Sequence, residues 1–285
     1  MAPSDSDYLD RLTSKYSKLV RFAGALEQPF LNWGYWCDDA GAADGRSRAV
    51  ASESLVRRVA RLADQRGAAS LLDVGCGTGG STVALARHLD VPSLIGVDLC
   101  GASIDFANDY LKATALQDRV RFLAANAVEL PFEDASFDTV TAIECAFHFH
   151  PRTRFFEAAN RLLRPGGQLI MTDWIQGRAS RTLIGRIISG WALKYWDIPK
   201  ANIVNLDGYE TSLRHAGFCT VSVTPIADKI IPHYARYVAT PKGFDELSIA
   251  MGRMKTRLYI GLVKLVHAAY RMGLVDYVIV EARKD

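Results

Sequence analysis

Apolar and polar positions follow two different periods along this chain. In residues 8–27 and 48–65 the apolar side chains recur at helical spacing, so the sequence predicts a helix in each range. Between residues 71 and 172 short apolar runs alternate with helical stretches. Such alternation is typical of βαβ units and predicts an α/β fold with a doubly wound, mostly parallel sheet. Ligands of such sheets bind at the carboxyl ends of the strands.

The individual elements follow from the same pattern. We expect strands at residues 71–74, 93–99, 120–124, 137–143 and 168–172. We expect helices at 81–89, 103–114 and 152–163. The sequence RPGG at 164–167 should end the last of these helices with a turn, because Pro and Gly interrupt helices.

The pattern loosens beyond residue 174. There it predicts helices at 178–196 and 209–216, a strand at 219–224, a long helical stretch at 229–272 and a final strand at 275–282. We therefore predict an N-terminal lid segment over 1–47 and one Rossmann-like domain over 48–285. Helical insertions near 175–206 and 229–272 should form a cap on that domain.

Composition narrows the class of protein. The 285 residues are 49% hydrophobic and 23% charged, as in an ordinary globular protein, and the net charge of +3 lacks the basic excess of nucleic-acid binders. Five scattered cysteines without a CxxC pair predict no disulfide framework and no metal site, and favour a cytoplasmic location. Residues 1–11 lack the apolar core of a signal peptide, and 258–270 is too short for a transmembrane segment.

A glycine-rich turn, DVGCGTGG at 73–80, follows the first expected strand. Gly75, Gly77 and Gly80 fit the GxGxxG spacing of dinucleotide-binding proteins. With Gly79 in place of Gly80, the spacing is the GxGxG of S-adenosylmethionine (SAM) methyltransferases. Glycine spacing alone leaves both readings open.

Two acidic residues favour the second reading. Asp73 would crowd a pyrophosphate, whereas it suits a cationic group such as the α-amino group of SAM. Asp98 ends the second expected strand, where a carboxylate can accept hydrogen bonds from both ribose hydroxyls. Each acid could instead cap a neighbouring turn or helix. Together, at the ends of adjacent strands, they predict a nucleoside site.

The order LLDVGCGTGG, LIGVDL, ANAVELPFEDASFDTVTAIEC and RLLRPGGQLIMTDW resembles the class I SAM-dependent methyltransferase family over about residues 68–175. The resemblance implies a seven-stranded sheet whose last strand is antiparallel, with SAM as cofactor. It implies that Gly75, Gly77 and Gly79 contact the methionyl part, that Asp98 holds the ribose, and that adenine lies against Leu99, Asn126 and Ala127. Asn126 stands where the family often has Asp.

The flanking sequences narrow the resemblance. LNWGYW, IECAFHFHPRTRFF and DYVIVEARK are similar to small-molecule O-methyltransferases that finish macrolide sugars and related bacterial natural products. In that family Glu144 corresponds to the point where the chain passes the sulfonium, and a histidine stands at the position of His148.

Methyl transfer to a hydroxyl requires removal of a proton, and His148 is the candidate base because neutral imidazole accepts one. The alternative is a histidine packed in the core. Glu144 could orient His148 or an acceptor hydroxyl, or could serve as an acceptor for backbone amides. The aromatic residues Trp33, Tyr35 and Trp36 could close over the cofactor as a lid or could be ordinary packing.

Residues 247–275 contain five basic residues and no acid, next to a stripe of apolar positions. This pattern fits a cap helix with a solvated basic face, a membrane-surface contact or a site for an anionic acceptor. The insertion at 229–272 could also hold a homo-oligomer together.

We therefore predict a SAM-dependent methyltransferase that acts on a hydroxyl of a small or medium-sized secondary metabolite, with this small-molecule acceptor as its partner. The alternatives are C-methylation of an isoprenyl diphosphate or similar anion, and N-methylation. Two more distant alternatives are an NAD(P)-binding oxidoreductase and a SAM-fold protein without catalytic activity.

Overall fold

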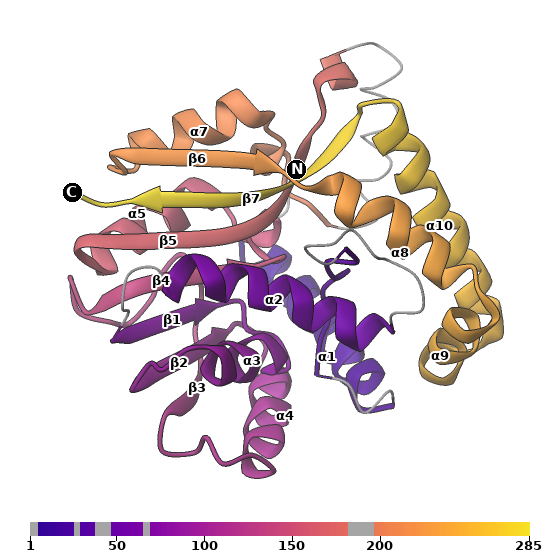
Figure 1. The fold of residues 1–285 in the computed structure, drawn as a ribbon, viewed down its shortest axis with the longest axis horizontal. Coiled ribbons are helices and arrows are strands. Elements are labelled where there is room, and N and C mark those ends of the chain that lie inside the picture. The colour runs from indigo at the N-terminus through magenta and orange to yellow at the C-terminus, as the bar shows by residue number, and fades with distance from the viewer. Residues whose placement is uncertain (1–4, 26–28, 38–46, 65–68, 182–196) are drawn as a thin grey trace.

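The computed structural model describes residues 5–25, 29–37, 47–64, 69–181 and 197–285. Its centre is a seven-stranded sheet with the order β3-β2-β1-β4-β5-β7-β6 (Figure 1). The strands are β1 (Ser70–Val74), β2 (Ser93–Asp98), β3 (Val120–Ala124), β4 (Phe137–Ile143), β5 (Leu163–Gln176), β6 (Thr220–Pro225) and β7 (Val275–Arg283). β1 to β5 pair in parallel, whereas β7 is antiparallel to both β5 and β6. The predicted fold class is confirmed.

Helices cover both faces of the sheet (Figure 1). They are α1 (Asp5–Ala25), α2 (Arg48–Asp64), α3 (Gly80–His88), α4 (Gly101–Lys112), α5 (Arg152–Leu162), α7 (Leu206–His215), α8 (Ile231–Val238), α9 (Pro241–Met251) and α10 (Arg253–Arg271). Of the helix expected at 178–196, residues 178–181 form a 3₁₀ turn, and 182–196 lie outside the described residues. None of the described helices is both long enough and apolar enough to cross a membrane.

The strand expected at 168–172 is longer in the structure, where β5 begins directly after α5. Leu163 pairs with Phe137 and Gln168 pairs with Thr139, so 164–167 bulge out of the ladder between two paired positions. Gly166 has a φ of 76°, which glycine adopts without strain. The RPGG sequence therefore interrupts the strand pairing of β5 instead of separating a helix from a strand.

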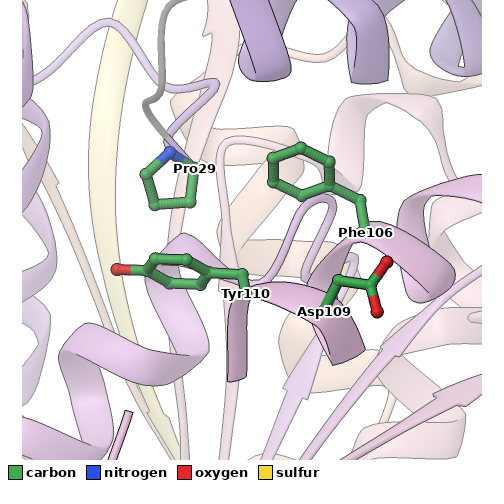
Figure 2. A pocket seen from close by; sticks show the side chains of 4 residues that line it. All are labelled: Pro29, Phe106, Asp109 and Tyr110. Carbon is green, nitrogen blue, oxygen red and sulfur yellow. The ribbon is translucent and has the colours of Figure 1, made fainter. Parts of the chain in front are cut away.

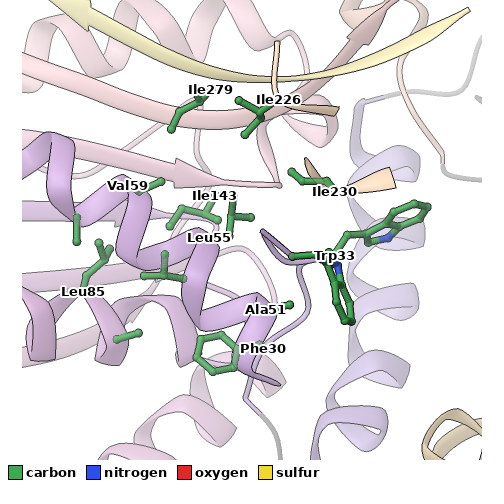
Figure 3. Close-up of a cluster of buried hydrophobic side chains, with 14 of the residues drawn as sticks. Phe30, Trp33, Ala51, Leu55, Val59, Leu85, Ile143, Ile226, Ile230 and Ile279 are labelled. Carbon is green, nitrogen blue, oxygen red and sulfur yellow. The ribbon is translucent and has the colours of Figure 1, made fainter. Parts of the chain in front are cut away.

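The core has one layer on each face of the sheet, because successive strand residues point to opposite faces. On one face, Leu71 packs with residues of α2 and α3 such as Leu55 and Leu85. On the other, Leu72 packs with residues of α5 and α7 that include Phe155 and Tyr209. Figure 3 shows that the first layer extends beyond the sheet to Phe30 and Trp33, which come from the segment before α2. The first layer therefore anchors that segment beside the sheet.

Candidate active site

The turn after β1 is shaped by glycines in left-handed conformations, with φ of 74° at Gly75, 53° at Gly77 and 83° at Gly79. A Cβ atom on Gly75 would lie 2.6 Å from the Cys145 sulfur, and one on Gly79 would lie 2.8 Å from the Ala107 Cβ. At Gly77 the nearest atom would be 3.4 Å away. Gly75 and Gly79 are thus required by close packing as well as by φ. Gly77 is the least crowded of the three positions, since a Cβ there would only touch the Leu31 side chain, and a ligand can approach the backbone most readily at this point.

Asp98 joins this turn to the one after β2. One carboxylate oxygen accepts a hydrogen bond from the Gly77 N–H at 2.9 Å, and the other accepts one from the Cys100 N–H at 2.9 Å. Burial raises the pKa of Asp98, and the two backbone hydrogen bonds oppose the rise. The next residue, Leu99, is half-buried. A carboxylate held this way keeps free lone pairs for hydroxyl donors.

The loop after β3 lies beside this carboxylate, because the Ala125 N–H donates to the Asp98 carbonyl at 3.0 Å. Asn126 is half-buried, and its side-chain oxygen accepts a bond from the Val128 N–H at 3.3 Å. Ala127 is buried. The fold therefore brings Asp98, Asn126 and Ala127 into neighbouring turns at one edge of the sheet.

Asp73 lies under the glycine turn and is almost fully buried. Its two oxygens accept hydrogen bonds from the hydroxyls of Thr82 at 2.7 Å and Thr141 at 2.8 Å. Burial raises its pKa to about 6, against the effect of these bonds. Asp73 thus ties β1 to α3 and β4. Its expected contact with the amino group of SAM stays a prediction.

Glu144 follows β4 with a φ of 55°, a conformation that costs a non-glycine residue free energy. Its carboxylate accepts hydrogen bonds from the Trp33 N–H at 2.9 Å and the Tyr277 hydroxyl at 3.1 Å. Burial raises its pKa to about 7, although these partners favour the charged form. Glu144 therefore anchors the segment before α2 to the end of β4.

We call residues 29–36 the N-terminal strap. It contacts the glycine turn, where the Thr78 hydroxyl donates to the Pro29 carbonyl at 2.8 Å. It also contacts α2 and the 227–229 turn, through the Tyr35 N–H to Ala51 and the Trp36 N–H to Lys229.

The strap ends in an aromatic cluster. Trp33 stacks on Tyr234 at 4.5 Å between ring centroids and meets Trp174 edge-on at 4.9 Å. Trp36 is buried beside Tyr237, with 4.9 Å between the ring centroids. Trp33 and Trp36 therefore belong to one packed layer that spans β5, α8 and the strap. Tyr35 is half-buried, and the Arg58 guanidinium of α2 lies over its ring at 5.6 Å from the centroid.

His148 lies in a single 3₁₀ turn, Ala146–His148, directly after Glu144 and Cys145. Its ring packs against Phe147 at 4.3 Å and Tyr16 of α1 at 5.5 Å, and its backbone carbonyl accepts from the Tyr8 hydroxyl at 2.8 Å. Only 5% of the residue is exposed, and Nδ1 has no hydrogen-bond partner among the described residues.

Burial lowers the pKa of His148 to about 3, and the positive charge of Lys15 acts in the same direction. This value is well below the ordinary pKa of a histidine, about 6.5. The imidazole is therefore neutral near pH 7, and it offers a lone pair. Glu144 bonds the strap and Tyr277, and no hydrogen bond among the described residues joins it to His148.

A buried ion pair that the sequence analysis missed supports the His148 turn. Arg152 bonds Asp173 at 2.8 Å, and the other oxygen of Asp173 accepts from the Phe147 N–H at 3.1 Å. The Tyr209 hydroxyl also donates to Asp173, and the Asn202 amide donates to the carbonyls of Phe147 and Phe149. Asp173 stands at the carboxyl-terminal part of β5 as Asp98 does on β2, and that position was the signal available in the sequence.

Three buried polar side chains at this edge of the sheet have atoms without a partner among the described residues. They are both amide atoms of Asn32, the Ser103 hydroxyl in the first turn of α4, and His148 Nδ1. Buried polar groups without partners are rare, since each one costs free energy. Together with the uncrowded backbone at Gly77 and the Asp98 carboxylate, they fit a polar ligand such as SAM and an acceptor.

A pocket between α4 and the first residue of the strap is lined by Pro29, Phe106, Asp109 and Tyr110 (Figure 2). Its one carboxylate, Asp109, bonds the exposed Lys112 at 2.8 Å. The lining contains no histidine, and its carboxylate is paired with Lys112, so it offers no unpaired base for a hydroxyl proton. We therefore assign the chemistry to the region around Glu144 and His148.

Known proteins resemble this chain in sequence. Residues 72–171 match a family model described as a methyltransferase domain. The 27-O-demethylrifamycin SV methyltransferase of Amycolatopsis mediterranei is 30% identical over 233 residues, which cover 80% of this chain and 82% of that protein. Erythromycin 3''-O-methyltransferase of Saccharopolyspora erythraea is 29% identical over 274 residues, with 90% and 84% covered.

Solved structures share the fold. The [4+2]-cyclase SpnF has a TM-score of 0.74 at 24% identity, with 97% of this chain and 96% of that chain covered. A geranyl diphosphate C-methyltransferase from Streptomyces coelicolor A3(2), solved with S-adenosyl-L-homocysteine, has a TM-score of 0.72 at 20% identity. That comparison covers 99% of this chain and all of the other.

Proposed function

This chain belongs to the class I SAM-dependent methyltransferase family, and we propose that it methylates a hydroxyl group of a small or medium-sized secondary metabolite. Its cofactor, SAM, supplies the methyl group on a positively charged sulfur. Relatives that cover most of the chain act as O-methyltransferases on a rifamycin and on erythromycin. Their names support the acceptor class that we propose, a hydroxylated natural product.

One observation carries the choice of a hydroxyl: the neutral, buried imidazole of His148 with its unpartnered Nδ1. A pKa of about 3 makes this nitrogen a weak base. A weak base suffices here, because a hydroxyl becomes strongly acidic as its oxygen takes on a methyl group. His148 Nδ1 would take the hydroxyl proton as the C–O bond forms and the C–S bond of the sulfonium breaks, and its low pKa would then return the proton to water.

On the cofactor side, we assign the ribose hydroxyls to Asp98 and the adenine to Leu99, Asn126 and Ala127. The methionyl part would lie along the turn of Gly75, Gly77 and Gly79. The support is the uncrowded backbone at Gly77 and the position of Asp98, whose oxygens are fixed by two N–H groups and still have lone pairs.

We propose that the N-terminal strap, with Trp33, Tyr35 and Trp36, acts as the lid over the reacting groups. It bonds the glycine turn through Pro29 and the end of β4 through Glu144. Aromatic rings beside a sulfonium stabilise its charge and exclude water. Glu144 then serves to fasten the lid, which is a positioning role.

C-methylation is the second candidate, and the aromatic surroundings of Glu144 favour it. Trp174 packs on Tyr277 at 5.0 Å, and Tyr277 bonds Glu144. A buried carboxyl group among aromatic rings could stabilise a carbocation and take its proton. The basic residues of α10, however, lie on the exposed side of that helix, which argues against a diphosphate site there.

The test is a methyl-transfer assay with labelled SAM and a panel of hydroxylated macrolides and ansamycins, with the methylated atom assigned by mass spectrometry and NMR. Transfer to oxygen supports the proposal. Transfer to carbon or nitrogen overturns it. Calorimetric titration with SAM and with NAD, run in parallel, tests cofactor binding separately from turnover, so that an inactive SAM-binding protein is also recognised.

A further inference from the structure

Helix α10 has a second apolar face that points away from the protein. Its inner side contributes Thr256, Val263 and Val266 to the buried interior. On its outer side, Met254 and Leu258 are 68% and 70% exposed, and Leu265 is 50% exposed. Seven large apolar side chains are exposed in the described part of the chain, and five of them lie at residues 249–272. Such clustering marks a contact surface, since exposed apolar side chains are otherwise scattered.

The exposed apolar residues form one continuous stripe. Positions 254, 258, 261, 265, 268 and 272 recur at steps of four and three, which keeps them on one side of a helix. Gly261 and Ala268, the small members of this set, are exposed as well. The stripe extends along the whole helix, roughly 28 Å at 1.5 Å per residue. Figure 1 shows α10 on the outer edge of the molecule, beyond α8 and next to α9.

Basic side chains border this stripe. Arg253, Arg257, Lys264 and Arg271 are all exposed and recur at steps of four and seven, so they form a row along one border. Lys255 lies on the opposite border. Residues 247–275 contain no acidic residue. The helix therefore presents an apolar stripe between positive charges, which is the pattern of helices that lie flat on a membrane surface.

The charges decide between two occupants of this face. Two copies of α10 packed stripe to stripe would bring ten positive side chains together with no acid from either helix, and like charges repel. An anionic lipid surface would pair the same side chains with phosphate groups. None of the described helices could cross a bilayer, so any such contact is peripheral.

We propose that α10 docks this protein on the surface of anionic phospholipid membranes. The stripe of Met254, Leu258, Leu265 and Met272 enters the head-group region, and the basic row contacts lipid phosphates. The inner side of α10 keeps its packing on α8, α9 and β7. The proposed membrane surface does not include Glu144 or His148. Docking should therefore occur with or without the methyl acceptor.

The test is co-sedimentation of the full chain with vesicles of phosphatidylglycerol and phosphatidylcholine, compared with vesicles of phosphatidylcholine alone. We expect binding to the anionic vesicles that weakens as salt is raised, and much weaker binding to the neutral ones. Lys264→Gln with Arg271→Gln should weaken binding about 25-fold, from about 1 kcal/mol, or fivefold, for each charge. Leu258→Ser with Leu265→Ser should weaken it as well, because less apolar area enters the lipid.

Matched controls use exposed residues elsewhere. Arg87→Gln on α3 and Leu123→Ser on β3 should leave vesicle binding unchanged. Equal binding to both vesicle types, no binding to either, or full binding by the α10 variants would overturn the proposal. Light scattering provides one more outcome: a dimer that the Leu258→Ser, Leu265→Ser variant converts to a monomer would assign the face to a second copy of the chain instead.

Discussion

Two regions at the same edge of the sheet differ in how far their buried polar groups are hydrogen-bonded within the protein. In the turns after β1 and β2, the oxygens of Asp73 and Asp98 each accept a hydrogen bond from the protein. In the strap and the turn after β4, the amide of Asn32 and Nδ1 of His148 have no partner among the described residues. The first region has its shape before any ligand binds, although the Ser103 hydroxyl in the first turn of α4 has no partner among the described residues. The second region is left for a ligand to complete.

This difference separates binding from chemistry. A preformed turn suits the cofactor, which is the same in every reaction cycle. The free energy needed to order this turn is spent during folding and does not reduce the binding affinity. Groups that are left without partners lower stability, and proteins retain them where a ligand or a reacting atom uses them. Removing a group from the first region should therefore reduce affinity for the cofactor. Removing one from the second should reduce turnover or acceptor binding and leave folding almost unchanged.

The largest effect is expected for His148→Ala. Loss of the base should lower turnover by about 10²–10⁴ at saturating SAM, with SAM affinity nearly unchanged. Because the pKa of His148 is about 3, its ionisation should produce no step in rate between pH 5.5 and 9. His150→Ala, two residues further along the chain, is the control and should keep most of the turnover. Turnover close to that of the wild type would end the hydroxyl-base proposal, and a larger loss in Glu144→Gln would favour C-methylation.

The next effect concerns the support under the His148 turn. Arg152→Met leaves the buried Asp173 carboxylate without its partner and should lower the free energy of unfolding by about 3–5 kcal/mol. Denaturant titration measures this. Lys112→Met, which breaks a fully exposed pair with Asp109, is the matched control and should change stability little. Equal stability of both variants would contradict the role given to the buried pair.

Asp98→Ala tests the preformed region. It removes the acceptor for the Gly77 and Cys100 N–H groups as well as the proposed ribose contacts, and should weaken SAM binding by about 2–4 kcal/mol. Isothermal titration calorimetry measures the affinity. Binding within twofold of the wild type would refute the ribose assignment. Asp109→Ala, on the exposed side of α4, should bind SAM normally.

Glu144 should make the free energy of unfolding depend on pH. Its folded pKa of about 7 lies above the ordinary 4.5, so the folded protein holds this proton more tightly than the unfolded chain. The corresponding stability is complete below pH 4.5 and is lost as pH rises to about 7, at most about 3 kcal/mol. Glu144→Gln should flatten this part of the curve. The free energy of unfolding is measured by urea titration at several pH values from 5 to 8. If its pH dependence is the same in Glu144→Gln and the wild type, burial does not destabilise the carboxylate.

The smallest effect is expected for Asn32→Ala. If a ligand uses the unpartnered amide, SAM or acceptor affinity should fall by about 1–1.5 kcal/mol, while the ligand-free protein loses no stability. Asn205→Ala is the opposite case, because Asn205 caps α7 through the Gly208 N–H. That variant should lose about 1 kcal/mol of stability and no affinity. Reversed results for the two asparagines would contradict the distinction between the regions.

The preformed region could be predicted from sequence because its contacts are local. Glycine spacing and strand ends fix the turn, and Asp98 and Gly77 are only 21 residues apart. The seven strands were likewise recovered from apolar periodicity, with the β5 bulge as an exception, since Pro and Gly can interrupt a strand as well as end a helix.

The second region depends on contacts between distant segments. Trp33 and Glu144 are 111 residues apart, Tyr277 and Glu144 are 133 apart, and Tyr8 and His148 are 140 apart. Periodicity carries no information on such pairs. The low pKa of His148 also depends on burial, which sequence alone does not show for a single histidine.

The strap has a consequence for protein engineering. Its Pro29 carbonyl touches the glycine turn, where Gly80 has no room for a Cβ, and its Trp33 N–H bonds Glu144. Residues 29–36 therefore cannot be exchanged between relatives as a module for acceptor choice alone. A chimera that takes this segment from another methyltransferase will inherit a change in cofactor affinity with it, unless Thr78 and Gly80 are transplanted as well.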